Sequence, residues 1–222
     1  MGPSGGLQMQ LRRQFARLTL AAILLAMLPV PAAAGEAMEQ LRGSVDQVLQ
    51  VLRDPRTKGA SPAAERRARI RQIVDDRFDF TEMARRALAM HWAARTPQER
   101  RDFTALFSNL LERSYIDKIE AYTDERIVYS GERVEGDFAE VRTKLEGKKN
   151  LDVPLEYRLL RRDGKWWVYD VVIEGVSLIA NYRTQFNKII QSTSYPELVK
   201  RMQAKLESEE AGDLSTPTPR RP

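Results

Sequence analysis

The sequence contains no cysteine in its 222 residues. This absence excludes disulfide bonds, thiolate nucleophiles and metal sites built on sulfur ligands. It also excludes the cysteine through which a bacterial lipoprotein carries its lipid, so we expect a chain that is released in soluble form. Such a protein must be stabilised by its core alone.

Histidine occurs only once, at His91. A histidine-based metal site lacks partner residues here, and a Ser-His-Asp triad would depend on this residue alone. The sequence also has no glycine-rich phosphate loop and no nucleophile-elbow motif. We therefore predict a binding protein and not an enzyme, with no catalytic residue, no metal and no cofactor, and we expect His91 to pack or cap at a helix end.

No acidic residue occurs before Glu36. The segment that precedes it has the three parts of a secretory signal peptide. Three arginines form a basic start, the uncharged apolar run 18–30 follows, and small residues lead to Ala34. A run of about 13 residues is shorter than the roughly 20 that span a bilayer. We therefore predict that residues 1–34 are a cleaved signal peptide and that the mature protein is soluble in the periplasm.

A large excess of positive charge is also absent once this leader is set aside. Three of the 36 basic residues but none of the 31 acidic ones lie before residue 35, so the net charge falls from +5 to +2. Lys and Arg residues are nowhere interleaved with aromatic residues in the manner of nucleic-acid-binding segments. These observations exclude nucleic acid as a partner.

Apolar residues recur at helical spacing on both sides of a central region. Predicted helices end at Asp54-Pro55 and near Leu88, and a long helix begins at Thr96-Pro97-Gln98-Glu99, which combines a cap, a first-turn proline and a capping box. Two more helices are predicted for residues 178–190 and 196–206. The polar, proline-rich segment 207–222 is predicted to be a disordered tail.

Between residues 126 and 174 the apolar period changes to two, which predicts antiparallel strands, and Asp163-Gly164 is a hairpin signal. Strands with one apolar face need a cover, and the flanking helices must supply it. The predicted fold class is therefore α+β. A curved antiparallel sheet of about four strands packs against several helices, as in NTF2-like domains, in a single domain over residues 35–206.

If Asp163-Gly164 is the turn, Tyr157 pairs with Asp170 and Leu155 pairs with Val172. A tyrosine and a carboxyl group in an apolar cavity can catalyse enolisation, so an isomerase- or lyase-like enzyme is one alternative. A cross-strand hydrogen bond between two partly buried polar groups is the interpretation that we favour. The long helix that begins after Thr96 carries an aromatic stripe that includes Phe103, Phe107 and Tyr115. This stripe is either plain core or the wall of an apolar cavity, and the sequence leaves both interpretations open.

Motifs in both halves of the chain occur in a specific order and spacing. They are Phe78-Asp79-Phe80-Thr81-Glu82-Met83-Ala84-Arg85, Trp92, Thr96-Pro97-Gln98-Glu99-Arg100, Val134-Glu135-Gly136-Asp137, Tyr157, Asp163-Gly164-Lys165-Trp166, Val168-Tyr169-Asp170-Val171, Gly175-Val176-Ser177-Leu178, Tyr182-Arg183 and Phe186. Together they resemble the MlaC family, the toluene-tolerance group of periplasmic phospholipid-binding proteins that serve as auxiliary components of ABC transporters. The resemblance covers residues 37–206, and one departure is Ala89, where family members often have glycine.

The resemblance implies a carrier that maintains outer-membrane lipid asymmetry. It would shuttle phospholipid, as cargo and not as a cofactor, between an outer-membrane lipoprotein complex and an inner-membrane complex of an MCE-domain protein with an ABC transporter. We expect a monomer whose acyl-chain cavity is lined by Phe103, Phe107, Leu111, Tyr115, Val141, Leu155, Val172, Val176, Ile179 and Tyr182. Arg142 and Arg183 are the candidates for the headgroup phosphate, and the remaining alternative is a lipid-free periplasmic adaptor whose stripe is core.

Overall fold

The structure is a computed structural model that describes residues 35–57, 63–122, 126–147 and 152–214. The predicted signal peptide, residues 1–34, lies outside the described residues. Among the residues that are described, no helix is both long and apolar enough to cross a membrane.

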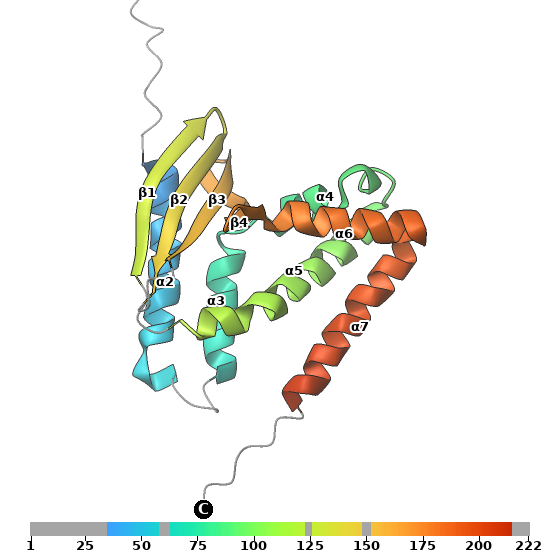
Figure 1. The fold of residues 1–222 in the computed structure, drawn as a ribbon, viewed down its shortest axis with the longest axis horizontal. Helices are drawn as coiled ribbons and strands as arrows, with labels where there is room; N and C mark the ends of the chain where they lie inside the picture. Colours follow the sequence, from blue (N-terminus) through green and yellow to red (C-terminus); the bar gives the residue numbers. More distant parts are fainter. Residues whose placement is uncertain (1–34, 58–62, 123–125, 148–151, 215–222) are drawn as a thin grey trace, which may run out of the picture. The chain divides into compact units, whose positions relative to one another are not determined.

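Five antiparallel strands form one sheet in the order β1-β2-β3-β4-β5 (Figure 1). Their bounds are β1 Arg126–Glu135, β2 Phe138–Glu146, β3 Asp152–Arg162, β4 Lys165–Ile173 and β5 Val176–Ser177. The predicted hairpin at Asp163-Gly164 is confirmed, and both of its residues have positive φ, 53° and 72°, as the two-residue turn requires. The α+β prediction is therefore confirmed, with a two-residue fifth strand added at the edge.

Helix α2 (Glu36–Arg53) covers one face of this sheet and runs alongside its strands in Figure 1. Together they form what we call the sheet core: Ala37, Leu41, Ala139, Val141, Leu159, Trp166 and Val168. The alternation expected of half-buried strands produces this face, because Ala139, Val141 and Thr143 are buried while the residues between them are not. The side chain of Glu132 holds the start of the helix by accepting hydrogen bonds from the backbone N–H groups of Gly35 and Met38, at 3.0 and 2.6 Å.

Four helices build a second cluster, the helical core. They are α4 (Phe80–Leu88), α5 (Pro97–Glu120), α6 (Leu178–Ser192) and α7 (Tyr195–Leu214). The helical core contains Met83, Ala84, Ala87, Leu88, Phe103, Phe107, Leu110, Leu111, Ile179, Phe186, Tyr195, Leu198 and Met202. Helix α5 begins at the predicted capping box, in which the Thr96 side chain accepts from Glu99 N–H and the Glu99 side chain accepts from Thr96 N–H.

The short 3-10 turn Pro55–Thr57 and helix α3 (Ala63–Asp75) follow α2, and the half-buried Arg77 after α3 joins α2 to the sheet. Arg77 donates to Ser44 Oγ at 2.9 Å, to Gln40 Oε1 at 3.1 Å and to the Trp166 carbonyl at 2.6 Å. Because these three hydrogen bonds reach two side chains of α2 and the backbone of β4, the guanidinium fixes the N-terminal half of α2 against β4.

Helix α7 ends at Leu214, eight residues beyond the predicted end at residue 206. The prediction of a disordered tail from residue 207 is therefore wrong for residues 207–214, and residues 215–222 lie outside the described residues. The physical reason is that Glu and Ala between 207 and 211 are good helix formers, and the first proline after Pro196 is Pro217.

Candidate functional site

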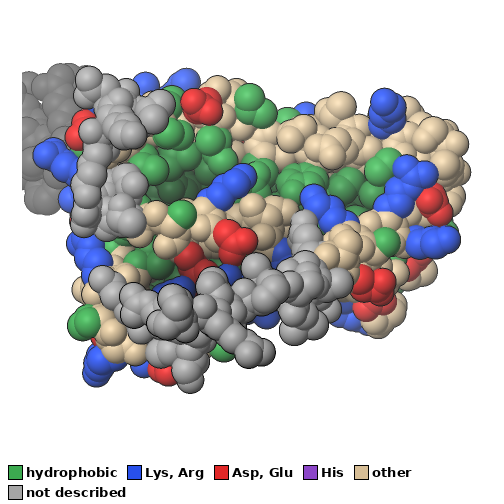
Figure 2. All heavy atoms as spheres, turned by 60° about the horizontal axis from the view of Figure 1, so that its bottom comes forward, with side chains coloured by type: hydrophobic (Ala, Val, Ile, Leu, Met, Phe, Trp, Pro, Cys, Tyr) green, Lys and Arg blue, Asp and Glu red, His purple; other side chains and the backbone are tan. Residues whose placement is uncertain are grey.

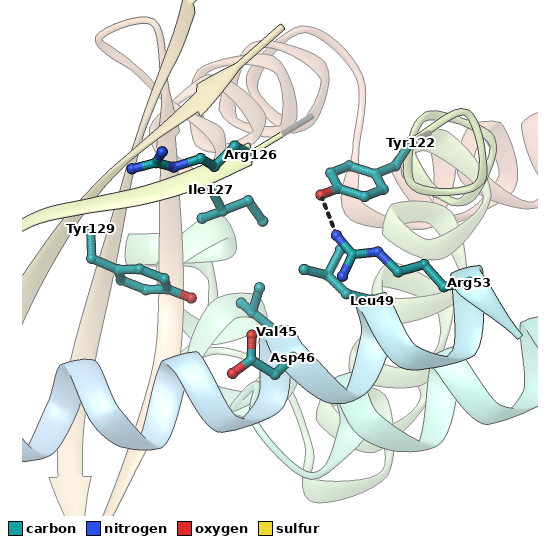
Figure 3. A pocket seen from close by; sticks show the side chains of 8 residues that line it. All are labelled: Val45, Asp46, Leu49, Arg53, Tyr122, Arg126, Ile127 and Tyr129. Carbon is teal, nitrogen blue, oxygen red and sulfur yellow. Dashed lines mark hydrogen bonds between the residues drawn. The ribbon is translucent and has the colours of Figure 1, made fainter. Parts of the chain in front are cut away.

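A pocket of about 320 Å³ lies between α2, the end of α5 and the start of β1 (Figure 3). Eight residues line it: Val45, Asp46, Leu49 and Arg53 from α2, Tyr122 after α5, and Arg126, Ile127 and Tyr129 from β1. The volume is near the lower end of the range for small-molecule pockets, roughly 300–1,000 Å³.

The apolar wall of the pocket follows from helix and strand periodicity. Val45 and Leu49 are four residues apart on α2 and therefore share one face of the helix, while Ile127 faces them from β1. All three side chains are half-buried and not fully covered by protein atoms. This wall offers apolar surface that a ligand can remove from water.

The polar wall carries two arginines, both exposed. The Arg53 guanidinium points toward the Tyr122 hydroxyl in Figure 3 and donates to it over 3.4 Å. Arg126 lies across the pocket on β1. Among the described residues, neither guanidinium forms an ion pair with a carboxylate, although Asp46 lies on the same lining.

Tyr129 projects its phenol into the pocket, as Figure 3 shows. Its hydroxyl oxygen is buried and has no hydrogen-bond partner within the described part of the chain, and the Arg42 guanidinium lies 4.6 Å from the ring centroid. Burial, followed by the charge of neighbouring groups, raises the pKa of Tyr129 well above its usual range. The phenol is therefore neutral, and it is available to donate a hydrogen bond to a ligand.

The β1 wall of the pocket continues across the sheet. Ile127 pairs with Leu145, and Leu145 pairs with Val153, so these side chains share one face of the sheet. Leu145 and Val153 are half-buried, whereas Val141 on the same face is fully buried beneath α2. The predicted lining residue Leu155 lies on this partly covered stretch and is half-buried as well.

Most of the other predicted lining residues lie in the helical core. Phe103 and Phe107 are 1% and 0% exposed, and their rings pack against Phe186 at centroid distances of 5.8 and 5.5 Å. Leu111, Ile179, Tyr182 and Tyr115 complete this group, the two tyrosines being half-buried. The structure therefore brings these six residues together as packed protein interior, and Lys118 lies over the outer face of the Tyr115 ring.

The remaining predicted residues are dispersed. Val141 belongs to the sheet core, Val172 is buried on the opposite face of the sheet, and Val176 is 59% exposed on the edge strand β5. Arg142 and Arg183 are exposed and neither lines the pocket. Arg142 lies on the sheet face away from α2, because it is one residue removed from the inward-facing Val141.

The predicted pairing of Tyr157 with Asp170 is wrong, and so is that of Leu155 with Val172. A β-bulge between Arg158 and Leu159 shifts the register by one residue, so Tyr157 pairs with Val171 and Arg158 pairs with Asp170. A shift of one residue moves each side chain to the other face. Tyr157 packs against the sheet core, and burial raises its pKa to about 12.

Asp170 lies instead beneath the start of α6. It accepts hydrogen bonds from the Ser177 hydroxyl at 2.6 Å, from Ile179 N–H at 3.0 Å and from Arg158 at 3.3 Å. The carboxylate accepts from three donors and holds the start of α6 in place. Tyr157, which the sequence predicted as its partner, lies on the opposite face of the sheet. The arrangement no longer contains the tyrosine–carboxyl pair on which the enzyme alternative depended.

His91 lies at the end of the short turn that follows α4, half-buried, with its Nε2 atom 2.9 Å from Asn187 Oδ1 of α6. This contact agrees with the expected packing role. Within the described ranges, no three His, Asp or Glu side chains are grouped so that they could hold a metal ion.

A family model described as MlaC protein matches residues 42–204 of this chain. The match covers more than half of the sequence and includes every wall of the pocket. The chain belongs to the MlaC family.

Two relatives can be compared with this MlaC family member. The intermembrane phospholipid transport system binding protein MlaC of Haemophilus influenzae is 24% identical over 123 residues, which are 53% of this chain and 58% of that protein. The chain thus spans little more than half the length of the curated relative it matches. A phospholipid-binding protein from Ralstonia solanacearum, solved in complex with a phospholipid, is similar with a TM-score of 0.70 and 24% identity, covering 78% of this chain and 98% of that one. At this identity the likeness shows a shared fold.

Sequence reasoning missed the pocket walls of this MlaC family member. The apolar stripe of α2 was visible, and its extension through Val45 and Leu49, beyond the buried Ala37 and Leu41, is the signal that could have located the pocket. The two arginines gave no such signal. Their place on one pocket depends on the end of α2 meeting the start of β1, which is a tertiary relationship.

Proposed function

We propose that this protein is a periplasmic phospholipid-binding protein that shuttles lipid between the outer-membrane and inner-membrane complexes of an Mla-type transport system. Membership of the MlaC family supports this proposal, as do the names of the relatives from Haemophilus influenzae and Ralstonia solanacearum. The predicted signal peptide of residues 1–34 supports export to the periplasm.

The observation that carries the proposal is the pocket with its partly covered extension along the sheet. Burying an acyl chain contributes about 0.8 kcal/mol per methylene group, so apolar surface of this kind is sufficient to hold a lipid tail away from water. Figure 2 shows hydrophobic side chains gathered in a hollow on one face of the molecule and continuing beside Lys and Arg side chains. An apolar hollow beside basic side chains is a surface suited to binding an amphiphile.

Loading of a complete lipid requires the pocket to widen. The N-terminal half of α2 is held by Glu132 and by the Arg77 network, whereas the pocket separates its C-terminal half from β1. In the loaded protein the C-terminal half of α2 moves away from β1, and the tail lies along Leu145 and Leu155. The other predicted residues lie outside the pocket lining: Phe103, Phe107, Leu111, Tyr115, Ile179 and Tyr182 in the helical core and Val141 in the sheet core.

The proposed chemistry is binding and release without a reaction at the lipid. Docking to a membrane complex supplies the opening, and transfer follows the difference in lipid affinity between the two sites. Tight burial of the tails with few contacts to the headgroup gives a broad phospholipid specificity.

A vesicle assay tests this function. Purified protein, first stripped of lipid, is added to vesicles of phosphatidylethanolamine and phosphatidylglycerol that contain self-quenched fluorescent phosphatidylglycerol. Fluorescence should rise in proportion to protein, and Leu49→Glu should reduce the rise because it places a charge on the apolar wall of the pocket. Met90→Glu is the matched control, since Met90 is 74% exposed and remote from the pocket lining. A folded wild-type protein that removes no lipid contradicts the proposal.

A further inference from the structure

The two arginines of the pocket differ from arginines elsewhere on the sheet that are held by carboxylates. Arg158 pairs with Glu156 and Arg161 pairs with Asp137, at 3.2 and 3.0 Å. Arg53 and Arg126 have no such carboxylate partner among the described residues, so their guanidinium groups retain donors for an anion. With Asp46 on the same lining, the pocket carries a net charge of +1.

The hydrogen bond that Arg53 makes within the described part of the chain is easily exchanged. Its donor and the Tyr122 hydroxyl oxygen are 3.4 Å apart, which is beyond the usual 2.7–3.2 Å for such a bond. A phosphate oxygen forms a shorter, charge-assisted bond with a guanidinium and can accept from two of its N–H groups at once. The Tyr129 hydroxyl, which has no hydrogen-bond partner among the described residues, can add a further donor from the same pocket.

Charge and apolar surface lie side by side in this pocket. Val45, Leu49 and Ile127 form one wall, and the guanidinium of Arg53 lies one helical turn beyond Leu49. A free phosphate ion would gain nothing from the apolar wall, whereas an amphiphile would use both walls. The lining therefore matches an acyl chain that ends in a phosphate group.

We propose that Arg53 and Arg126 bind the phosphate group of a phospholipid whose acyl chain lies on Val45, Leu49 and Ile127. This inference deepens the proposed lipid-binding function and rests on it. It moves the headgroup site from Arg142 and Arg183, which were expected from the sequence, to the end of α2. Lipid enters with its tail toward the sheet, and the phosphate replaces Tyr122 as the partner of Arg53.

Paired lipids that differ only in the phosphate test this site. Lipid-free protein is titrated with fluorescent phosphatidylglycerol and with fluorescent diacylglycerol that carries the same acyl chains. The wild type should bind the phosphate-containing lipid more tightly, and salt should weaken that preference. Arg53→Gln combined with Arg126→Gln should weaken phosphatidylglycerol binding about tenfold, because two charge-assisted contacts are lost, and should leave diacylglycerol binding within about twofold.

Two further variants keep the test decisive. Arg183→Gln with Arg201→Gln removes the same charge from exposed arginines of α6 and α7 that do not line the pocket, and it should change neither affinity. Arg53→Lys with Arg126→Lys keeps the charge but cannot donate two parallel N–H groups to one phosphate, so its preference for phosphate should lie between those of the wild type and the glutamine variant.

The other possible outcomes contradict either the headgroup site or the lipid-binding function. An equal loss of both lipids in the glutamine variant, or no loss of either, contradicts the headgroup site while leaving lipid binding intact. Inorganic phosphate that binds alone as tightly as phosphatidylglycerol shows an ion site and also contradicts it. If the folded wild type binds neither lipid, the proposed function itself is wrong.

Discussion

The Asp170 carboxylate accepts a hydrogen bond from the Ser177 hydroxyl, with 2.6 Å between Oδ2 and Oγ. The Ser177 oxygen in turn accepts from Ala180 N–H at 3.0 Å, and the other Asp170 oxygen accepts from Ile179 N–H at 3.0 Å. The first N–H groups of a helix have no partner within the helix. In α6 two of them, from Ile179 and Ala180, are satisfied by Asp170 of β4 and by the capping residue Ser177. This relationship fixes α6 to the sheet.

Asp170→Ala should lower the free energy of unfolding by about 2–3 kcal/mol, because Asp170 is 4% exposed and its removal leaves buried donors without partners. Urea denaturation measures the change. Asp152→Ala removes a carboxylate that is 46% exposed and should cost less than about 1 kcal/mol. Equal costs for the two variants would refute the role of Asp170 at the helix start.

Phe107→Ala should lower the free energy of unfolding by about 3–5 kcal/mol, the usual cost of a cavity at a buried aromatic residue. Phe107 is 0% exposed, and its ring centroid lies 5.1 Å from that of Tyr182. Calorimetry measures the effect, with Phe138→Ala as control because Phe138 is 50% exposed. A small effect at Phe107 would show that this site is an open lipid wall and not filled core.

Ala89→Gly should raise the free energy of unfolding by about 1 kcal/mol. Ala89 ends α4 with φ 48° and ψ −117°, a conformation that is strained for a residue with a Cβ atom and open to glycine. Chemical denaturation of the variant measures the gain. Ala121→Gly supplies the contrast, because Ala121 has φ −71° and glycine there should be destabilising. A loss of stability in Ala89→Gly would contradict the strain.

Stability should fall as the pH drops from about 5 toward 3. Burial works against the charged form of Glu120, but hydrogen bonds from Arg67 and Arg66 outweigh it and lower the pKa of this carboxyl group. A lowered pKa means that the stabilisation is present above the unfolded-state pKa and is lost as the pH falls through the folded-state pKa. Thermal melting of wild type and Glu120→Gln should show a weaker dependence in the variant over that window. Identical pH profiles would contradict the assignment.

The sequence predicted the class of fold because its signals were local. The capping box at Thr96, the turn at Asp163-Gly164 and the change of apolar period all act within a few residues. The departure at Ala89 was also visible, and the positive φ found there gives a physical reason for glycine at this position in relatives.

Local sequence signals could not predict the register between β3 and β4 or the position of the pocket. A single bulge between Arg158 and Leu159 separates Tyr157 from Asp170, and nothing in the local residue pattern marks it. The aromatic stripe of α5 fitted both core and cavity from the sequence, and in the structure it packs against α6 and α7. The pocket residue Arg126 depends on how β1 meets the end of α2, which only the tertiary structure specifies.

Mass spectrometry of the lipid that remains with the purified protein tests the central claim most directly. Export with the native leader and mild purification should yield protein that carries phospholipid in a fixed ratio, and extraction should release intact acyl chains together with the phosphate headgroup. Leu49→Glu protein, prepared in the same way, should carry much less. A folded wild-type protein that carries no phospholipid and takes none from vesicles would contradict the account and leave the lipid-free adaptor as the function to pursue.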